Sequence, residues 1–318
     1  MTDTPRLLLI GGGLPQVRAR IATLYDVIDL PSDGVADFLA KEGAGIVAVA
    51  TFSGIKPEVM AALPDLKVIS SFGVGYDSID AQEAARRGIL VGHTPDVLND
   101  EVADTTIMLW LAASKQLIPG DAWARSGMWE EKGNYPLTKS VRGRTVGILG
   151  LGRIGQTIAE MATMFDATIV YHTRSKKDVP YTYYADLVEM AHACDVLVVI
   201  TPGGAATKHL VNAEVMDALG PEGILINVAR GSVVDEVAMI SALQDGRLGA
   251  AGLDVFEGEP HIPDALKALN NTVLAPHIGS ATVETRDAMG ALVCENLESW
   301  LSNGSIKACV PECQHLNG

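Results

Sequence analysis

The chain has 318 residues, a formal net charge of −15 and a hydrophobic fraction of 48%. This composition excludes a disordered chain, and the length suggests two domains of about 150 residues each. The negative charge argues against a nucleic-acid or anionic-membrane surface, because phosphate groups would be repelled over most of the protein. No apolar run reaches the roughly 18 residues of a membrane helix. The N-terminus leads only into Leu7–Ile10, so we expect no signal peptide.

The number and spacing of the cysteines and histidines bear on the cellular compartment and on metal binding. Four cysteines are too few for a disulfide scaffold in a chain of this length, and none form a CxxC pair. The seven histidines are scattered without the spacing of metal ligands, so we expect no metal. We therefore expect a cytoplasmic protein in a reducing compartment.

Short apolar runs alternate with helical patterns along the chain, which is typical of parallel sheets with crossover helices. The first series of predicted strands is Leu7–Ile10, Val27–Leu30, Ile46–Ala50, Val68–Ser71 and Ile89–Gly92. Helices are predicted between them at Gln16–Leu24, Pro57–Leu63 and Ile79–Arg87. The second series of strands is Thr145–Leu149, Thr168–Tyr171, Val196–Ile200, Gly223–Val228, Ala250–Val255 and Thr272–Ala275. The pattern predicts an α/β fold with two doubly wound parallel sheets.

Two longer helices are predicted outside these series. Glu101–Leu117 is apolar around most of its circumference, which indicates burial in an interface between domains or between subunits. Thr282–Leu301 carries its large apolar residues on one face, and Asn303-Gly304 ends it.

The motif Gly150-Leu-Gly152-Arg-Ile-Gly155 follows a predicted strand and opens a helix with apolar residues at helical spacing. In such a turn the first glycine permits the bend, the second lets a pyrophosphate approach the backbone, and the third lets helix pack against strand. The helix N-terminus then offers N–H groups and its positive dipole end to the phosphates. The motif predicts a dinucleotide site; the alternative is a glycine-rich turn without a ligand.

The segment after the second strand of this series bears on the choice of dinucleotide. An Asp or Glu about 20 residues after the glycines accepts hydrogen bonds from the ribose 2′-hydroxyl of NAD. Here His172 stands in that place, followed by Thr173, Arg174, Ser175 and two lysines. Arg174 can bind a 2′-phosphate, and the two hydroxyls can donate to it. The segment favours NADP(H) over NAD(H); the alternative is a solvated loop.

Polar residues stand at the ends of three later strands: Arg230, then Asp254 and Glu259, then His277. In open α/β sheets ligands bind beyond the carboxyl ends of the strands, so these three loops can converge. Reduction of a 2-keto acid needs a cation for the carboxylate, an acid for the keto oxygen and a partner that orients the acid. Each residue taken singly could be an ordinary surface residue. With the dinucleotide loop upstream, they predict an active site.

These motifs, in this order, resemble the D-isomer-specific 2-hydroxyacid dehydrogenase family over nearly the whole chain. The segments that carry the resemblance are Val74-Gly75-Tyr76-Asp77-Ser-Ile-Asp80, the Val102–Leu117 helix, the glycine loop, Asn227-Val-Ala-Arg230-Gly231, Gly252-Leu-Asp254-Val-Phe-Glu-Gly-Glu259-Pro260 and Ala275-Pro-His277-Ile-Gly279. Within the family, the chain is most similar to the NADP-preferring glyoxylate/hydroxypyruvate reductases through Tyr171–Ser175.

The resemblance implies a role for each residue of the predicted active site. Arg230 would bind the substrate carboxylate and keto oxygen. His277 would be the acid in reduction and the base in oxidation. Glu259 would hydrogen-bond His277 and favour its charged form. The implied reaction is NADPH-dependent reduction of glyoxylate to glycolate and of hydroxypyruvate to D-glycerate.

The resemblance also implies binding roles around that centre. The backbone N–H groups of Val74 and Gly75 would hold the substrate carboxylate, and Asp254 would face the nicotinamide side of the cofactor. The predicted cofactor site consists of Gly150, Gly152, Arg153, Ile154, Gly155, His172, Thr173, Arg174, Ser175, Thr201, Pro202, Val228, Ala229, Asp254, His277 and Gly279.

A discontinuous domain organisation and a homodimer follow from the same resemblance. A Rossmann dinucleotide-binding domain, residues 99–282, would be inserted into a flavodoxin-like substrate-binding domain made of residues 1–98 and 283–318. The homodimer would be built around Glu101–Leu117.

Two alternatives stay open. The same chemistry could act on a bulkier 2-keto acid such as hydroxyphenylpyruvate or 2-ketogluconate. Phe52 could then wall the pocket, and Trp129 or Tyr135 could reach in from a partner subunit, although we interpret all three as packing residues. A nucleotide-sensing protein like the carboxy-terminal-binding corepressors would share the fold. It would need a long tail or a peptide-docking surface, and we expect no tail because the sequence ends at Gly318 soon after the last predicted helix.

Overall fold

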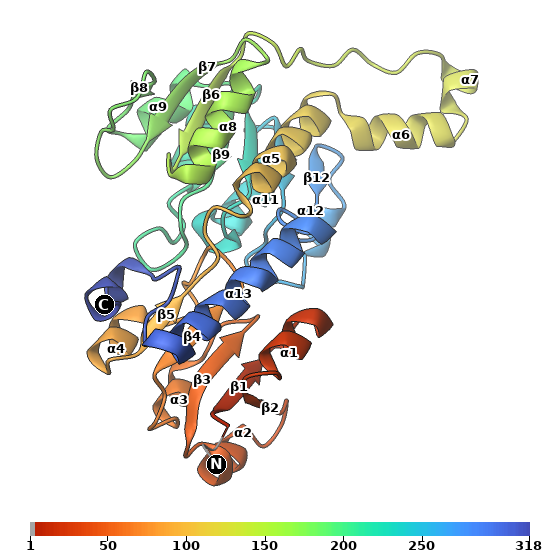
Figure 1. The fold of residues 1–318 in the computed structure, drawn as a ribbon. Coiled ribbons are helices and arrows are strands. Elements are labelled where there is room, and N and C mark those ends of the chain that lie inside the picture. Colours follow the sequence, from red (N-terminus) through yellow and green to blue (C-terminus); the bar gives the residue numbers. More distant parts are fainter. Residues whose placement is uncertain (1–3) are drawn as a thin grey trace. The chain divides into compact units, whose positions relative to one another are not determined.

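The computed structural model describes residues 4–318, and Figure 1 shows its ribbon. The chain divides into two compact units. The first comprises Met1–Leu98, described from residue 4, together with Thr282–Gly318; the second is Asn99–Ala281. The expectation that there is no signal peptide refers in part to residues 1–3, which lie outside the described residues.

The first unit is built on a five-stranded parallel sheet with strand order β2-β1-β3-β4-β5. Its strands are β1 (Arg6–Ile10), β2 (Asp26–Asp29), β3 (Ile46–Thr51), β4 (Val68–Ser71) and β5 (Leu90–Gly92). Its helices are α1 (Pro15–Ile21), α2 (Val35–Glu42), α3 (Pro57–Ala61), α4 (Ala81–Arg86), α13 (Val283–Asn303) and the 3-10 helix η2 (Pro311–Leu316). Helix α13 packs on β4 and beside α1, so the C-terminal segment completes a unit begun at the other end of the chain.

The second unit is built on a seven-stranded parallel sheet with strand order β12-β11-β10-β9-β6-β7-β8. Its strands are β6 (Thr145–Leu149), β7 (Thr168–His172), β8 (Thr182–Tyr183), β9 (Val196–Val199), β10 (Ile224–Asn227), β11 (Ala250–Leu253) and β12 (Thr272–Leu274). Its helices are α5 (Asn99–Ser114), α6 (Leu117–Arg125), α7 (Met128–Lys132), α8 (Arg153–Thr163), α9 (Leu187–Ala193), α10 (Ala213–Leu219), η1 (Gly231–Val233), α11 (Glu236–Gln244) and α12 (Asp264–Lys267).

Both faces of this second sheet are covered by helices, as the apolar strand sequences require. Along β11, Ala251 and Leu253 join the core that includes Met239 of α11. Gly252 between them points the other way, where an added Cβ would meet Leu109 of α5 at 3.0 Å. Side chains alternate along a strand, so one short segment contributes to two layers.

Because all strand pairs in this sheet are parallel, the carboxyl ends of the strands share one edge. The loops that follow β6, β7, β9, β10, β11 and β12 therefore begin at that edge. These loops contain the residues predicted to bind a dinucleotide and to carry the chemistry.

The predicted fold class is confirmed: the chain folds into two parallel-sheet α/β units, with a flavodoxin-like strand order in the first. The prediction of one helix over Glu101–Leu117 is wrong at its end. Helix α5 ends at Ser114, Gln116 is left-handed with φ +50°, and α6 begins at Leu117. Pro119 explains the break, since in a continuous helix its ring would clash with the carbonyl of Lys115. No range was predicted for the two-residue strand β8 or for the helices α2, α6, α7, α9, α10, α11 and α12.

Candidate active site

The space around the glycines of the loop after β6 shows whether a dinucleotide can bind to this unit. Gly150 has φ +105°, and an added Cβ would lie 2.7 Å from the backbone nitrogen of Thr201. A Cβ on Gly155 would lie 2.3 Å from the carbonyl oxygen of Gly150. Contacts inside the protein therefore require two of the glycines. A Cβ on Gly152 would meet no described atom within 4 Å, so open space adjoins the backbone where α8 begins, as a bound pyrophosphate needs.

The loop after β7 is folded by its own hydrogen bonds. The buried Tyr171 hydroxyl donates to the carbonyl of Lys177 at 3.1 Å and accepts from its N–H at 2.8 Å. The Thr173 hydroxyl donates to the carbonyl of Ser175 at 2.7 Å. His172 Nδ1 lies 3.0 Å from the carbonyl oxygen of Tyr184. Arg174 is exposed, and within residues 4–318 it has no ion-pair partner.

Arg230 lies in a turn after β10. The side chain of Asn227, the last residue of that strand, fixes this turn by hydrogen bonds. The buried Asn227 side chain accepts from the N–H of Ala229 at 3.1 Å and donates to the carbonyl of Arg230 at 3.0 Å. The Arg230 guanidinium donates to the carbonyl of Ala229 at 2.8 Å. This role of Asn227 was not predicted. An amide at the end of a buried apolar strand was the available signal, because buried polar side chains need partners.

Gly231 lets the next loop approach the turn of Arg230. A Cβ on this residue would lie 1.9 Å from the carbonyl carbon of Phe256 and 2.3 Å from the nitrogen of Glu257. Only glycine allows two backbones to come this close. The loops that carry Arg230 and Glu259 are therefore packed directly on each other.

His277 and Glu259 form a hydrogen-bonded pair. His277 Nδ1 lies 2.7 Å from Glu259 Oε2, and the other carboxylate oxygen accepts from the N–H of Phe256 at 2.9 Å. The His277 side chain is 48% exposed, so the ring is accessible beyond its bond to Glu259. Its backbone is left-handed, with φ +54°, which is uncommon for a non-glycine residue and typical of functional sites.

Asp254 holds the His277 loop in place. Its carboxylate oxygens accept from the N–H of Ile278 at 2.7 Å and of Gly279 at 2.8 Å. Its carbonyl accepts from the N–H of His277 at 2.9 Å. The residue is 2% exposed, so three hydrogen bonds fix the loop without solvent.

The two carboxyls have pKa shifts of opposite sign. Burial by itself raises the pKa of Glu259, but hydrogen bonds from His277 and Phe256 and the charges of His277 and Arg230 outweigh it, and the pKa is lowered. Burial also raises the pKa of Asp254, and its two backbone hydrogen bonds offset this only in part. The lowered pKa of Glu259 favours its ionised form beside His277.

The second unit thus brings together the turn of Arg230, Glu259, Asp254 and His277 at the edge of the sheet where the glycine loop also lies. Thr201 and Pro202 follow β9, and Val228 and Ala229 follow β10, at the same edge. Val74 and Gly75 belong to the first unit, where the carbonyl of Val74 lies 2.9 Å from His93 Nδ1. Their predicted contact with the substrate carboxylate stays a prediction.

Within residues 4–318, no group of three or more His, Cys, Asp or Glu side chains is arranged to hold a metal ion. In the same residues, none of the helices has the length and apolar character needed to cross a membrane.

The known proteins that this chain resembles agree with the geometry of the site. The family model described as "D-isomer specific 2-hydroxyacid dehydrogenase, NAD binding domain" matches residues 107–279. The chain is 49% identical to a hydroxyphenylpyruvate reductase of Plectranthus scutellarioides, over 84% of this chain and 86% of that protein. It is 49% identical to glyoxylate/hydroxypyruvate reductase A of Arabidopsis thaliana, over 80% and 81%.

A solved structure is similar over almost the whole length. It is an NADPH-dependent glyoxylate/hydroxypyruvate reductase of Sinorhizobium meliloti in complex with NADP and malonate, 44% identical, with a TM-score of 0.92 over 98% of both chains. The matches to the family model and to these relatives each cover more than half of the chain. On this evidence, the chain belongs to the D-isomer specific 2-hydroxyacid dehydrogenase family.

Proposed function

We propose that this protein is an NADPH-dependent reductase of small 2-keto acids, converting glyoxylate to glycolate and hydroxypyruvate to D-glycerate. The observation that carries the proposal is the pair of His277 and Glu259 at 2.7 Å beside Arg230. The Arabidopsis relative and the Sinorhizobium structure, which are named for these two substrates, support the choice of substrate.

The residues of this chain divide the reaction among them. Arg230 offers a planar cation that can meet the carboxylate and the keto oxygen at two points. Glu259, ionised because its pKa is lowered, accepts the Nδ1 proton of His277, which leaves Nε2 directed to the substrate. When bound, the nicotinamide cofactor supplies the hydride that reduces the keto carbon. His277 Nε2 gives its proton to the keto oxygen, which becomes the hydroxyl, and then regains a proton from water.

The preference for NADPH rests on the loop after β7. No carboxylate stands between His172 and Lys177 to repel a 2′-phosphate. Arg174 is exposed and has no ion-pair partner in residues 4–318, so its guanidinium is available for such a phosphate. The relative that was solved with NADP supports the same preference. NAD(H) remains the second cofactor to test.

A bulkier 2-keto acid is the second candidate substrate. The Plectranthus relative is named for hydroxyphenylpyruvate and is as similar in sequence as the Arabidopsis one. Phe52 bears on the choice: its ring stacks on Phe72 with centroids 4.7 Å apart, so it has a packing partner within the first unit.

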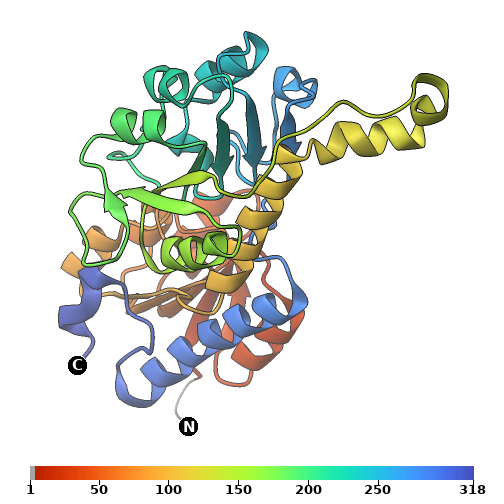
Figure 2. The ribbon, with the colours of Figure 1, turned by 90° about the horizontal axis from the view of Figure 1, so that it is seen from above.

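We further propose a division of labour between the units and a homodimer. The unit Asn99–Ala281 would bind the cofactor, and the other unit would supply Val74 and Gly75 for the substrate carboxylate. The segment α6–α7 supports the dimer, because α6 buries none of its residues and extends from the rest of its unit in both views (Figures 1 and 2). The predicted cytoplasmic location belongs to the same proposal.

The experiment that tests the function is the loss of dihydronicotinamide absorbance. Purified protein would be mixed with NADPH or NADH and with glyoxylate, hydroxypyruvate, pyruvate, phenylpyruvate, hydroxyphenylpyruvate or 2-ketogluconate. We expect the fastest oxidation with NADPH and the two small acids, and a kcat about 10²–10⁴-fold lower in His277→Ala. Turnover of the bulky acids alone would move the assignment to the second candidate. NADPH binding without turnover of any keto acid would contradict an enzymatic role.

A further inference from the structure

A second histidine–carboxylate pair takes its carboxylate from the same loop as the first. His209 Nε2 is 3.0 Å from Glu257 Oε1, and both side chains are about one third exposed, at 36% and 35%. Glu257 precedes Glu259 by two residues, in the loop after β11. The N–H of Glu257 also donates to Glu236 Oε2 at 3.3 Å, where α11 begins. The His277 mechanism makes no use of this pair.

The backbone of His209 contacts a different loop. Its N–H donates to the carbonyl of Ser232 at 2.8 Å, and Ser232 follows Arg230 by two residues. The pairing continues along the chain, since the N–H of Val211 donates to the carbonyl of Val233 at 3.0 Å. His209 therefore bonds through its backbone to the loop of Arg230 and through its ring to the loop of Glu259.

The conformation of His209 is consistent with a residue held from both sides. Its φ is +50°, in the left-handed region that non-glycine side chains seldom adopt. Such a conformation persists where surrounding contacts determine it. His277 is left-handed as well, at φ +54°.

The two loops that His209 joins also touch each other, at Gly231 and the Phe256–Glu257 peptide. Because the two backbones are in direct contact, a displacement of Glu257 would move Gly231, and Arg230 with it. Each residue that His209 contacts lies two positions along the chain from a catalytic residue: Ser232 from Arg230, and Glu257 from Glu259.

We propose that His209 is a positioning residue, which fixes Arg230 and Glu259 relative to each other through its bonds to Ser232 and Glu257. The inference rests on the proposed function for the roles of Arg230 and Glu259. His209 itself would touch neither substrate nor cofactor. Its effect would be on geometry, because a misplacement of about 1 Å in a catalytic group can lower the rate by up to about a hundredfold.

The experiment compares two replacements of the same residue. His209→Leu removes the ring nitrogen, whereas His209→Gln keeps an N–H that can donate to Glu257. Neither side chain is branched at Cβ, so the left-handed conformation at position 209 should strain the two variants to a similar extent. We expect His209→Leu to lower kcat/KM for the preferred keto acid about 10- to 100-fold, and His209→Gln to stay within about threefold of the wild type.

Two further variants locate the effect. Glu257→Ala removes the other partner, and we expect the double variant with His209→Leu to lose little more than either single one, as coupled residues do. Arg247→Leu is the matched control. It breaks a comparably exposed ion pair, with Asp217, at the opposite end of β11, and kcat/KM should not change.

A spectroscopic readout keeps this test separate from the proposed function. The proton shared by His277 Nδ1 and Glu259 should give a downfield proton resonance, assigned by its loss in His277→Asn. We expect His209→Leu to shift or broaden this resonance and Arg247→Leu to leave it unchanged. A wild-type protein that reduces no keto acid would refute the proposed function, and the resonance would still decide the positioning role. The role is overturned if His209→Leu lowers only the melting temperature, with kcat, KM and the resonance unchanged.

Discussion

Arg174 is the residue through which the cofactor preference can be tested. It lies in the exposed loop after β7, which Tyr171 and Thr173 fold by their own hydrogen bonds. Arg174→Ala should therefore keep the loop and remove one charge-assisted contact, worth about 1.5–3 kcal/mol. We expect the Kd of NADPH to rise about 10- to 100-fold and that of NADH to change little. Fluorescence titration measures both constants, with Lys176→Ala as a neighbouring control. An equal loss for both cofactors would contradict binding of the 2′-phosphate.

Glu259 gives a pH dependence with a definite sign. Because its pKa is lowered in the folded protein, the pair stabilises the fold at a pH above the unfolded value of about 4.3. That contribution is lost as the pH falls through the lowered folded pKa. Glu259→Gln should thus lower the urea midpoint at about pH 6, and its difference from the wild type should shrink towards about pH 3. A difference that stayed constant across this range would show that the charge of Glu259 does not stabilise the fold.

At this scale, sequence could predict residues whose type fits a chemical task. Arg230, Glu259 and His277 were selected because a keto acid needs a cation, an acid and a carboxylate partner, and the structure brings the His277–Glu259 pair to 2.7 Å. Asn227 and His209 could not be selected in that way. Asn227 holds a turn two and three residues ahead of it, a supporting role that no step of the chemistry calls for, and His209 pairs with Glu257, which becomes its neighbour only in the fold. The support given by Asp254 to the His277 loop was hidden for the same reason, since its two N–H partners follow it by 24 and 25 residues.

Among the elements, the regular strands were predictable and the breaks between helices were not. The strands β4 and β6 begin and end at the predicted residues, and both are buried along all or most of their length. The end of α5 depends on Pro119, which stands three residues beyond the left-handed Gln116. Composition alone favours a continued helix there.

The close packing of the loops at the edge of the second sheet can be tested by adding one methyl group. Gly231→Ala would place a Cβ 1.9 Å from the carbonyl carbon of Phe256, so one of two backbones must move. We expect a loss of about 1–3 kcal/mol in the free energy of unfolding, measured in urea, together with a lower kcat/KM. Gly258→Ala in the same loop is the matched control, because its nearest atom would be the His261 carbonyl oxygen at 3.8 Å. Equal stability of the two variants would contradict the close packing.

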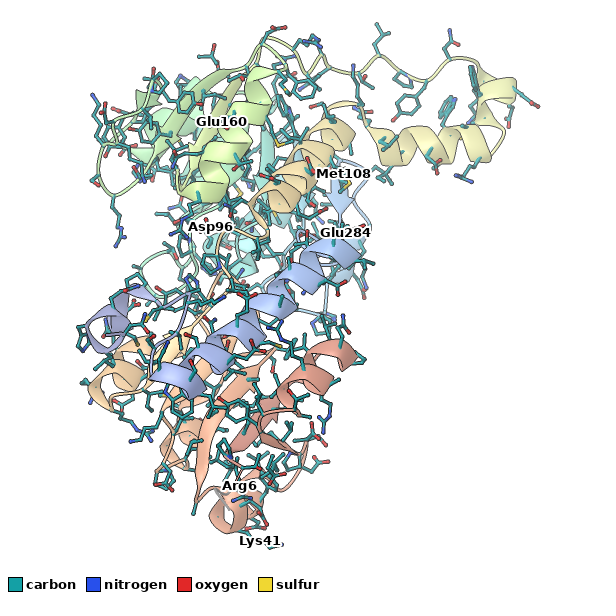
Figure 3. All side chains as sticks on the ribbon, in the orientation of Figure 1. Arg6, Lys41, Asp96, Met108, Glu160 and Glu284 are labelled. Carbon is teal, nitrogen blue, oxygen red and sulfur yellow. The ribbon has the colours of Figure 1, made fainter. Side chains whose placement is uncertain are left out.

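At the scale of the whole molecule, the exposed apolar surface of the single chain bears on its assembly. The apolar side chains of α6 and α7 lack cover within residues 4–318: Leu117, Ile118 and Trp129 are each more than half exposed. Trp129 was interpreted as a packing residue, and its 62% exposure contradicts that interpretation for the single chain. Met108 of α5, labelled in Figure 3, adds a further exposed apolar side chain. A groove of about 730 Å³ lies between this segment and the sheet, lined by residues such as Ala113, Trp123, Met128 and Val273.

A second copy of the chain would cover this surface, since exposed apolar patches of this kind mark association sites. Replacing Leu117 and Ile118 together by glutamate should weaken the dimer about 10²–10⁴-fold, because burial of each side chain contributes about 1.5–3 kcal/mol. Sedimentation velocity over a concentration series measures the change. Val237→Glu is the control, an isolated apolar residue on α11 that is 78% exposed. A wild-type protein that sediments as a monomer would contradict the dimer itself. A double variant that still dimerises like the wild type would place the interface elsewhere, because two charges at the centre of an apolar contact are not accommodated without loss of affinity.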